Sequence, residues 1–427
     1  MVAETAPARA PVFGRHERTT LAFLGLATAV GATGLAAGGT AGALLGADLA
    51  GSDAAAGVPL GLLVIGSAAS AVLISVLTPR LGRAQSLTLG YLVGAAGATV
   101  VVAAAVNESF ALLLLGSVLV GAANAAIFLT RYAAADAVRA EVRGRALGTV
   151  FFATALGAIA SPLLLGPSGD LAKVASLPRL SGLYVVAVVA FLLAGLTLVV
   201  ASTRVRELGP STAGAAGGEA RLGLHELLAG LQATRARASL IILGTSNLVM
   251  VGVMAVAPVH LTEHAHHRLE FVGAVISLHV AGMFAPSPIS GWLADRVGPI
   301  AVAVAGFGLL VATGLAGTLV DLESGFAVTL LLVVLGVGWN FGIVGGSTLL
   351  SASTNPRLRP YAEGIGEVAM GVAAGIGAPL AGVLVAGGGF ASLWIAGAVV
   401  ATVVGAYTIR SVQRLQPLPA ARKGESA

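Results

Sequence analysis

The chain has 427 residues, of which 57% are apolar and only 10% charged, and its mean hydropathy is +0.94. This composition excludes a soluble globular domain and predicts an integral membrane protein whose main partner is the lipid bilayer. The net charge of +5 does not come from a basic surface interleaved with aromatic residues, so we expect no nucleic-acid partner. The absence of cysteine excludes disulfides, thiolate zinc sites and a CxxC redox centre.

Twelve apolar windows follow one another along the chain, each about long enough to cross a ~30 Å hydrocarbon core. They are 20–43, 59–77, 84–106, 110–129, 146–165, 182–201, 239–259, 271–292, 300–319, 326–344, 364–385 and 390–409. We therefore predict an all-α membrane protein of twelve transmembrane helices in two six-helix bundles. The bundles are residues 1–202 and 238–427, joined by a polar linker at 203–237.

The basic residues indicate the orientation. If the first window starts in the cytoplasm, all but three of the 24 lysines and arginines lie on the cytoplasmic side; the exceptions are Lys173, Arg179 and Arg268. Such a bias is typical of cytoplasmic loops. It predicts a multi-pass protein of the inner (cytoplasmic) membrane with a cytoplasmic linker and both termini cytoplasmic. We expect a monomer.

The two halves carry traces of a duplication. The segment SVLTPRLG at 75–82 aligns with GWLADRVG at 291–298, an offset of 216 residues, and the same offset carries Asn124 onto Asn340. We expect these two asparagines to bridge helices. Parallel six-helix repeats with a substrate site between them are typical of secondary carriers.

GWLADRVG, the six-plus-six arrangement and the central linker resemble the major facilitator superfamily over essentially the whole chain. The resemblance implies that Asp295 and Arg296 act in a cytoplasmic gate of an alternating-access cycle. A tight turn, with Asp295 capping a helix and Arg296 as a topological charge, explains the motif equally well. Because Pro79 replaces the aspartate in the first copy, we expect any latch to depend on the second half.

Methionine is scarce, yet three of the four internal methionines form a pattern with one histidine: Met250-x-x-x-Met254 in the seventh window and His279-x-x-x-Met283 in the eighth. Each spacing puts two side chains on one helix face, and we expect the two faces to meet across a helix hairpin near the middle of the membrane. Thioethers with one imidazole favour Cu(I) over Mg²⁺ or Ca²⁺. Their counterparts at the 216 offset contain neither methionine nor histidine.

This pair of motifs resembles the CcoA-like copper transporters, a branch of the same superfamily. The resemblance implies that Met250, Met254, His279 and Met283 are copper ligands of an importer, with copper as substrate and no resident cofactor. A cytoplasmic metal chaperone would be its partner. The chain departs from some members because it has no membrane cysteine. Alternatively, the methionines fill gaps in the packing and His279 hydrogen-bonds Ser246, Asn247 or a backbone carbonyl.

Two further groups are candidates. The loop between the two motifs carries four histidines that suit metal capture, although a solvated polar loop is the alternative; they are His260, His264, His266 and His267. Glu363 and Glu367, one turn apart at the start of the eleventh window, are candidates for proton coupling. Glu363 could instead complement a helix N-terminus.

Two rival functions stay open. One is proton-coupled efflux of drugs or small organic solutes. Two observations argue against it: the first window has no carboxylate, and the fourth window, 110–129, has no arginine. The other is a non-transporting metal sensor or chaperone, for which the linker and tail leave no room for a docking domain. We find no nucleophile–base pair, phosphate loop or HExxH motif, so we do not expect an enzyme.

Overall fold

The computed structural model describes residues 12–35, 37, 41–52, 55, 57–204, 229–261 and 269–413, and the regular elements in these ranges are all helices. The helices of the first half are α1 (Arg15–Ala32), α2 (Gly42–Ala50), α3 (Val58–Leu81), α4 (Arg83–Val106), α5 (Phe110–Asp136), α6 (Arg143–Leu163), α7 (Leu165–Val174) and α8 (Gly182–Arg204). Those of the second half are α11 (Thr234–Val259), α12 (Leu269–Phe284), α13 (Ser287–Val297), α14 (Pro299–Ala316), α15 (Gly325–Ser353) and α16 (Arg359–Gln413).

Ten helical stretches in the described residues are long and apolar enough to cross a membrane. Two features complete the count of twelve passes. The first pass is divided into α1 and α2, and the 55-residue α16 contains two passes that meet at Gly389. The predicted twelve-helix, all-α fold is therefore confirmed. Most of the predicted linker, 205–228, lies outside the described residues.

Gly389 allows α16 to turn back on itself. Its backbone has φ 69° and ψ −178°, a conformation that side chains disfavour. We expect Gly389→Ala to lower the free energy of unfolding by about 1–3 kcal/mol, measured by thermal unfolding of the purified protein in detergent. Gly387→Ala is the matched control, because Gly387 is helical and nothing would lie within 4 Å of an added Cβ. Equal losses in both variants would contradict this assignment.

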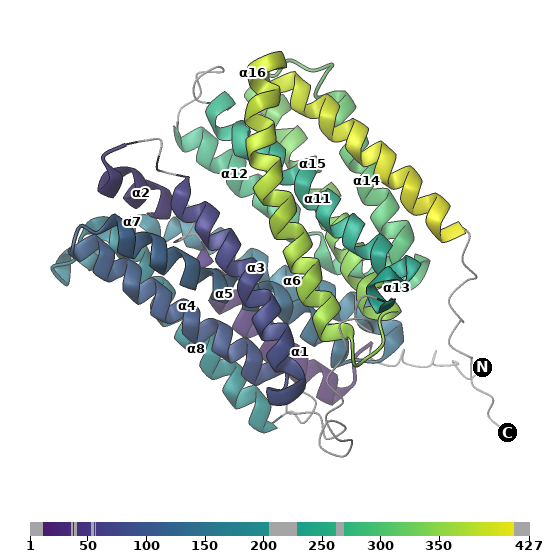
Figure 1. Ribbon diagram of the computed structural model, residues 1–427, viewed down its shortest axis with the longest axis horizontal. Helices are drawn as coiled ribbons and strands as arrows, with labels where there is room; N and C mark the ends of the chain where they lie inside the picture. Colours follow the sequence, from purple (N-terminus) through teal and green to yellow (C-terminus); the bar gives the residue numbers. More distant parts are fainter. Residues whose placement is uncertain are drawn as a thin grey trace, which may run out of the picture.

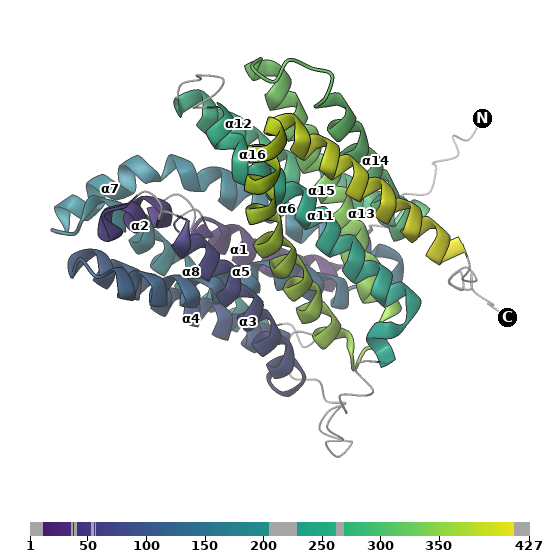
Figure 2. The same cartoon turned by 45° about the horizontal axis from the view of Figure 1, so that its top comes forward.

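The helices form two groups, α1–α8 (purple to teal) and α11–α16 (teal through green to yellow), which lie side by side in both views (Figures 1 and 2). Three pairs of helices make most of the contact between them: α3 packs against α16, and α6 packs against both α12 and α13. The protein is therefore two bundles that meet along two lines of helix packing.

The 216-residue offset relates these two lines to each other. A Cβ placed on Gly148 of α6 would lie 2.1 Å from the Ser287 carbonyl oxygen, and a Cβ on Gly364 of α16 would lie 3.0 Å from the Ala71 carbonyl oxygen. The offset carries Gly148 onto Gly364 and Ala71 onto Ser287. Both crossings thus use a glycine to bring two helix backbones together, as small residues do in membrane proteins.

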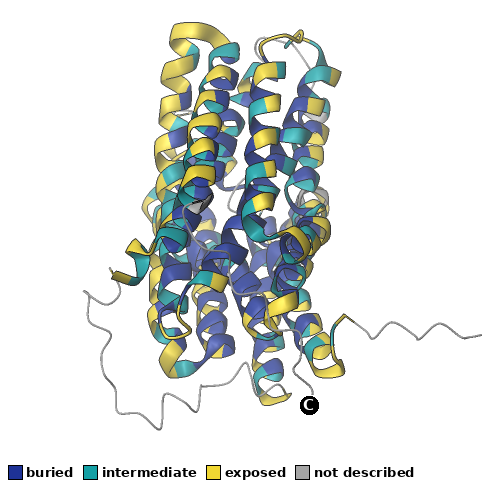
Figure 3. Ribbon diagram, turned by 90° about the vertical axis from the view of Figure 1, so that its right-hand side faces the viewer, coloured by how far each residue is buried: buried dark blue, intermediate teal, exposed yellow. Residues whose placement is uncertain are grey.

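The bundles are joined at one end, here called the Asp295 end. α16 is buried across the bundle interface at Ala362 and Glu363, both 0% exposed, whereas Val372, Ile376 and Val383 farther along are more than half exposed. Figure 3 shows the buried, dark blue ribbon concentrated toward one end of the molecule. The described state is therefore closed at the Asp295 end and more open at the opposite end.

Candidate functional site

A buried ion pair, Arg131 with Glu367, joins the two bundles. Arg131 lies in α5 of the first bundle and is 0% exposed, and Glu367 lies in α16 of the second bundle and is 9% exposed. The Arg131 Nη2 donates to the Glu367 Oε1 at 2.7 Å, and the Arg131 Nε donates to the Ser347 Oγ on α15 at 3.1 Å. The offset of 216 carries Arg131 onto Ser347, so this contact joins equivalent positions of the two halves.

Arg131 also has partners on its own bundle. Its Nη1 donates to the Phe128 carbonyl oxygen at 2.6 Å and its Nη2 donates to the Tyr132 hydroxyl at 3.3 Å. The guanidinium carbon lies 4.5 Å from the Tyr132 ring centre and 5.4 Å from that of Phe151. These contacts are cation–π geometry, which stabilises a desolvated cation. Arg131 is thus held by the first bundle even apart from Glu367.

Arg131 is a buried interface residue that the apolar windows of the sequence do not reveal. The prediction that the fourth helix ends at residue 129, with Arg131 in a loop, is wrong, because α5 continues to Asp136. Apolar windows end at the first charge, whereas here the charge is compensated by a carboxylate 236 residues away. The available signal was spacing: Asn124, Phe128 and Arg131 recur on one helix face. The absence of a helix-four arginine therefore no longer counts against proton-coupled transport.

A second buried group of charges joins the bundles beside the first. Arg83, at the start of α4, donates to Asp136 of its own bundle at 2.6 Å and to Glu363 of α16. Arg359 of α16 donates back to Asp136 at 2.7 Å. Glu363 is therefore an interface ion-pair partner with a 0% exposed side chain, and both predicted glutamates bind arginines of the other bundle.

Asp295 docks on the first bundle. Its carboxylate accepts hydrogen bonds from the backbone N–H groups of Gly144 at 2.7 Å and Arg145 at 3.0 Å, at the start of α6. A helix start offers unpaired N–H groups and a positive dipole end, so a carboxylate is stabilised there. Arg296 instead lies over the ring of Trp292 on its own helix, 5.1 Å from the ring centre.

The two helices that carry the Met/His pattern do not form the expected hairpin. α11 packs against α16 and α15, and α12 packs against α15 and α6, so α15 lies between them. The reason is glycine on two sides of α15: an added Cβ on Gly336 would lie 2.8 Å from the His279 carbonyl oxygen, and one on Gly342 would lie 2.1 Å from the Ser246 Oγ. Neighbours in sequence are therefore not neighbours in packing here.

His279 is 1% exposed, and its Nδ1 lies 2.6 Å from the Leu332 carbonyl oxygen of α15. This is one of the carbonyl contacts that the packing interpretation allowed. The contact puts the ring proton on Nδ1, which leaves a lone pair on Nε2. Nε2 is buried and has no hydrogen-bond partner in the described part of the chain.

The methionines pack on a common apolar cluster. Met250 is 8% exposed and belongs to the cluster that includes Phe284 and Trp339, and the half-buried Met254 and Met283 pack against it. Metal coordination by these four residues stays a prediction. Among the described residues, no three His, Asp or Glu side chains form a group that could hold a metal ion.

Three asparagines bridge helices. Asn124 donates to Ser67 of α3 at 2.9 Å, and Asn340 donates to the Met283 carbonyl oxygen at 2.7 Å, as expected for both. Asn247 of α11 accepts a hydrogen bond from the Trp339 indole N–H at 3.1 Å and donates to the Met370 carbonyl oxygen at 2.8 Å. The Trp339 ring is therefore fixed between α11, α15 and α16.

Only part of the predicted capture loop is described. The His260 ring stacks on Phe390, with ring centres 4.2 Å apart, and its Nε2 lies 3.0 Å from the Leu322 carbonyl oxygen. His264, His266 and His267 lie outside the described residues.

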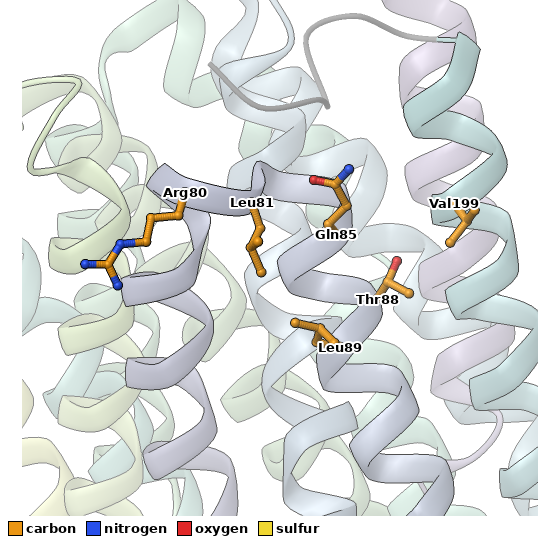
Figure 4. Close-up of a pocket in the computed structure, with 6 residues that line it drawn as sticks. All are labelled: Arg80, Leu81, Gln85, Thr88, Leu89 and Val199. Atoms are coloured by element: carbon orange, nitrogen blue, oxygen red, sulfur yellow. The ribbon is translucent and has the colours of Figure 1, made fainter. Parts of the chain in front are cut away.

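A hollow in the first bundle contains none of the predicted site residues (Figure 4). It is lined by Arg80, Leu81, Gln85, Thr88, Leu89 and Val199.

Comparison with known proteins agrees with this architecture. A profile of the Major Facilitator Superfamily matches residues 21–268 and 239–426. The uncharacterized MFS-type transporter YddS of Bacillus subtilis (strain 168) is 35% identical over 93% of this chain and 92% of its own. The riboflavin transporter RfnT of Brucella anthropi is 27% identical over 95% of this chain and 98% of its own. In fold, the chain is similar to the transporter FucP in its outward conformation, with a TM-score of 0.71, 15% identity and coverage of 93% and 99%. The chain belongs to the Major Facilitator Superfamily and is a membrane transporter rather than an enzyme.

Proposed function

We propose that this chain is a proton-coupled secondary transporter of a small organic solute, in which separation of the bundles at the Asp295 end requires protonation of Glu367. The observation that carries the proposal is the buried Arg131–Glu367 pair across the interface. Alternating access requires such a contact to break once in every cycle. The name of the relative RfnT supports an organic solute.

Arg131 and Glu367 differ in the contacts that each retains when the bundles separate. Arg131 stays charged at all relevant pH values and retains Phe128, Tyr132 and Phe151 on its own bundle. Glu367 loses the partner that the structure gives it. An unpaired carboxylate in a membrane interior is costly, and binding a proton removes the charge. Proton binding therefore favours the state that is open at the Asp295 end.

The neighbouring contacts follow the same pattern. Arg83 retains Asp136 when the bundles separate, whereas Glu363 loses Arg83, and Asp295 loses the N–H groups of α6. Asp136 of the first bundle likewise loses Arg359 of the second, but it retains Arg83. We propose that Asp295 is the latch of the gate. The gating role of Arg296 stays a prediction from the family pattern.

The lysine and arginine bias supports a cytoplasmic Asp295 end, with α1 beginning there and both termini on that side. Arg131 is removed from the count, but the remaining basic residues keep the same asymmetry. With this orientation the described state is open to the outside. The linker at 203–237 is then cytoplasmic.

Soft-metal transport, with copper as substrate and import as the direction, is the second candidate function. The observation that favours it is the buried Nε2 of His279, which has no hydrogen-bond partner among the residues that the structure describes, while Nδ1 contacts a carbonyl oxygen as in many metal-ligating histidines. Met254 and Met283 would supply thioethers, and a cytoplasmic chaperone would receive the ion.

Radioactive copper accumulation in whole cells tests the metal candidate. Under it, His279→Ala and Met254→Ala lower accumulation about tenfold or more, because outer-shell and ligand losses have effects of this size. Leu278→Ala is the matched control, since Leu278 is half exposed beside His279. Unchanged accumulation in both variants, at normal protein levels, rules out copper transport through this site and leaves the organic solute.

A further inference from the structure

One group of aromatic residues lies at the bundle interface. Only 5% of the residues are aromatic, and four of these form a connected cluster of Phe128 on α5, Phe151 on α6, Phe284 on α12 and Trp339 on α15. Phe151 lies 5.0 Å from Phe284 and 5.9 Å from Trp339 between ring centres. Phe284 meets Trp339 edge to face at 5.6 Å. We call these four residues the aromatic cluster.

The scaffold does not require this cluster. The 216 offset carries the four positions onto Val344, Glu367, Ala68 and Ala123, none of which is aromatic. The two halves share their glycine crossings but not these rings. The cluster is therefore not part of the repeated scaffold, and it lies where helices of both bundles meet.

Three rings of the cluster are buried, and its half-buried edge is formed by Phe128. The Asn247 amide fixes the Trp339 ring, which is 1% exposed. Phe128, Met254 and Met283 at the edge are half-buried. Thioethers adapt to irregular shapes and make favourable contacts with aromatic rings. Because the other three rings are buried, a flat ring would reach the cluster at this half-buried edge.

The charges around the cluster exclude one class of aromatic solute. The four carboxylates described in the bundle interface are all engaged: Glu367 with Arg131, Glu363 and Asp136 with Arg83, and Asp295 with the start of α6. Among these described groups a planar cation therefore meets no free carboxylate, and an anion meets no free guanidinium, because Arg131 and Arg83 are paired with the same carboxylates. An uncharged ring has no such penalty.

We infer that the solute is an uncharged planar aromatic molecule that stacks on the edge of the aromatic cluster, with the thioethers of Met254 and Met283 beside it. This inference rests on the proposed organic-solute transport and specifies its substrate class. It also gives the scarce methionines a role that needs no metal.

Tryptophan fluorescence tests the inference on the full-length protein in detergent. The chain has three tryptophans, so Trp292→Phe/Trp394→Phe leaves Trp339 as the reporter. We expect lumichrome, an uncharged tricycle, to quench this signal saturably, and ribitol (a polyol) and ethidium (a planar cation) to leave it unchanged. Should the double variant fold poorly, the same titration on the wild-type chain and on Trp339→Phe isolates the Trp339 contribution.

Binding is measured separately through the fluorescence of lumichrome itself. Phe128→Leu is expected to weaken binding roughly tenfold, because it removes the ring at the half-buried edge, whereas Phe128→Tyr retains most of it. Absence of lumichrome binding, or equal quenching by ethidium, overturns the inference. Because the pH-dependent movement of the bundles is measured without any solute, that movement can persist when the inference fails, which separates the two proposals.

Discussion

Replacing Arg131 by methionine is expected to lower the free energy of unfolding by about 3–5 kcal/mol, because the substitution leaves Glu367 charged and buried without its partner. Glu367→Met should have a comparable effect, since it leaves the arginine unpaired. The double variant Arg131→Met/Glu367→Met should recover most of the stability, because neither charge remains. Thermal unfolding of the purified protein in detergent measures all three.

The Arg139–Glu17 pair provides the control. Arg139 is 62% exposed and lies 3.5 Å from Glu17, so Arg139→Met should change stability little. A double variant no more stable than the two single variants would show that Arg131 and Glu367 are not energetically coupled. In transport, the stable double variant should lose most of its dependence on a proton gradient while it still binds solute.

The second large effect is expected at Gly148. An alanine Cβ there would lie 2.1 Å from the backbone oxygen of Ser287 on the other bundle, which no side-chain rotation can relieve. Gly148→Ala should therefore destabilise the state that is closed at the Asp295 end by about 1–3 kcal/mol, a five- to 150-fold shift toward the open state. Labelling of a single cysteine introduced at this interface, in a chain that has no other, measures the shift.

Alanine substitutions at two other glycines provide comparisons for this prediction. Gly364→Ala, at the equivalent crossing, should have a smaller effect, because its closest contact is the Ser75 Oγ, a side-chain atom that can move. Gly308→Ala should have none, since nothing would lie within 4 Å of its Cβ. Labelling that is as strong in Gly308→Ala as in Gly148→Ala would contradict the assignment of this crossing.

Much of the fold could be predicted from the sequence because membrane insertion imposes a simple length rule on apolar segments. The offset of 216 was readable from the repeated loop motif, and both loop copies end in a glycine with positive φ, Gly82 and Gly298. The same offset relates the Gly148 and Gly364 crossings. Local patterns therefore predicted the helices and their internal symmetry.

The site was less predictable, because its contacts are non-local. From the sequence, Arg131 is interpreted as a loop charge, because its partner Glu367 is distant along the chain. The Met250 and His279 faces are predicted to meet, but α15 lies between their helices. Phe151 and Trp339 are unremarkable in apolar windows, and nothing in their spacing indicates that they meet. Sequence spacing gives the face of a helix but not the helix that it faces.

Electron–electron distance measurements with paired spin labels test the central proposal most directly. One pair, at Arg80 and Arg357, spans the two bundles at the Asp295 end, and another, at the exposed Val174 and Leu319, spans them at the opposite end. Lowering the pH should lengthen the first distance and shorten the second, because protonated Glu367 releases Arg131. The Arg131→Met/Glu367→Met variant should respond far less. Distances that do not change with pH, or that change in the same direction at both ends, would contradict a gate that opens when Glu367 binds a proton.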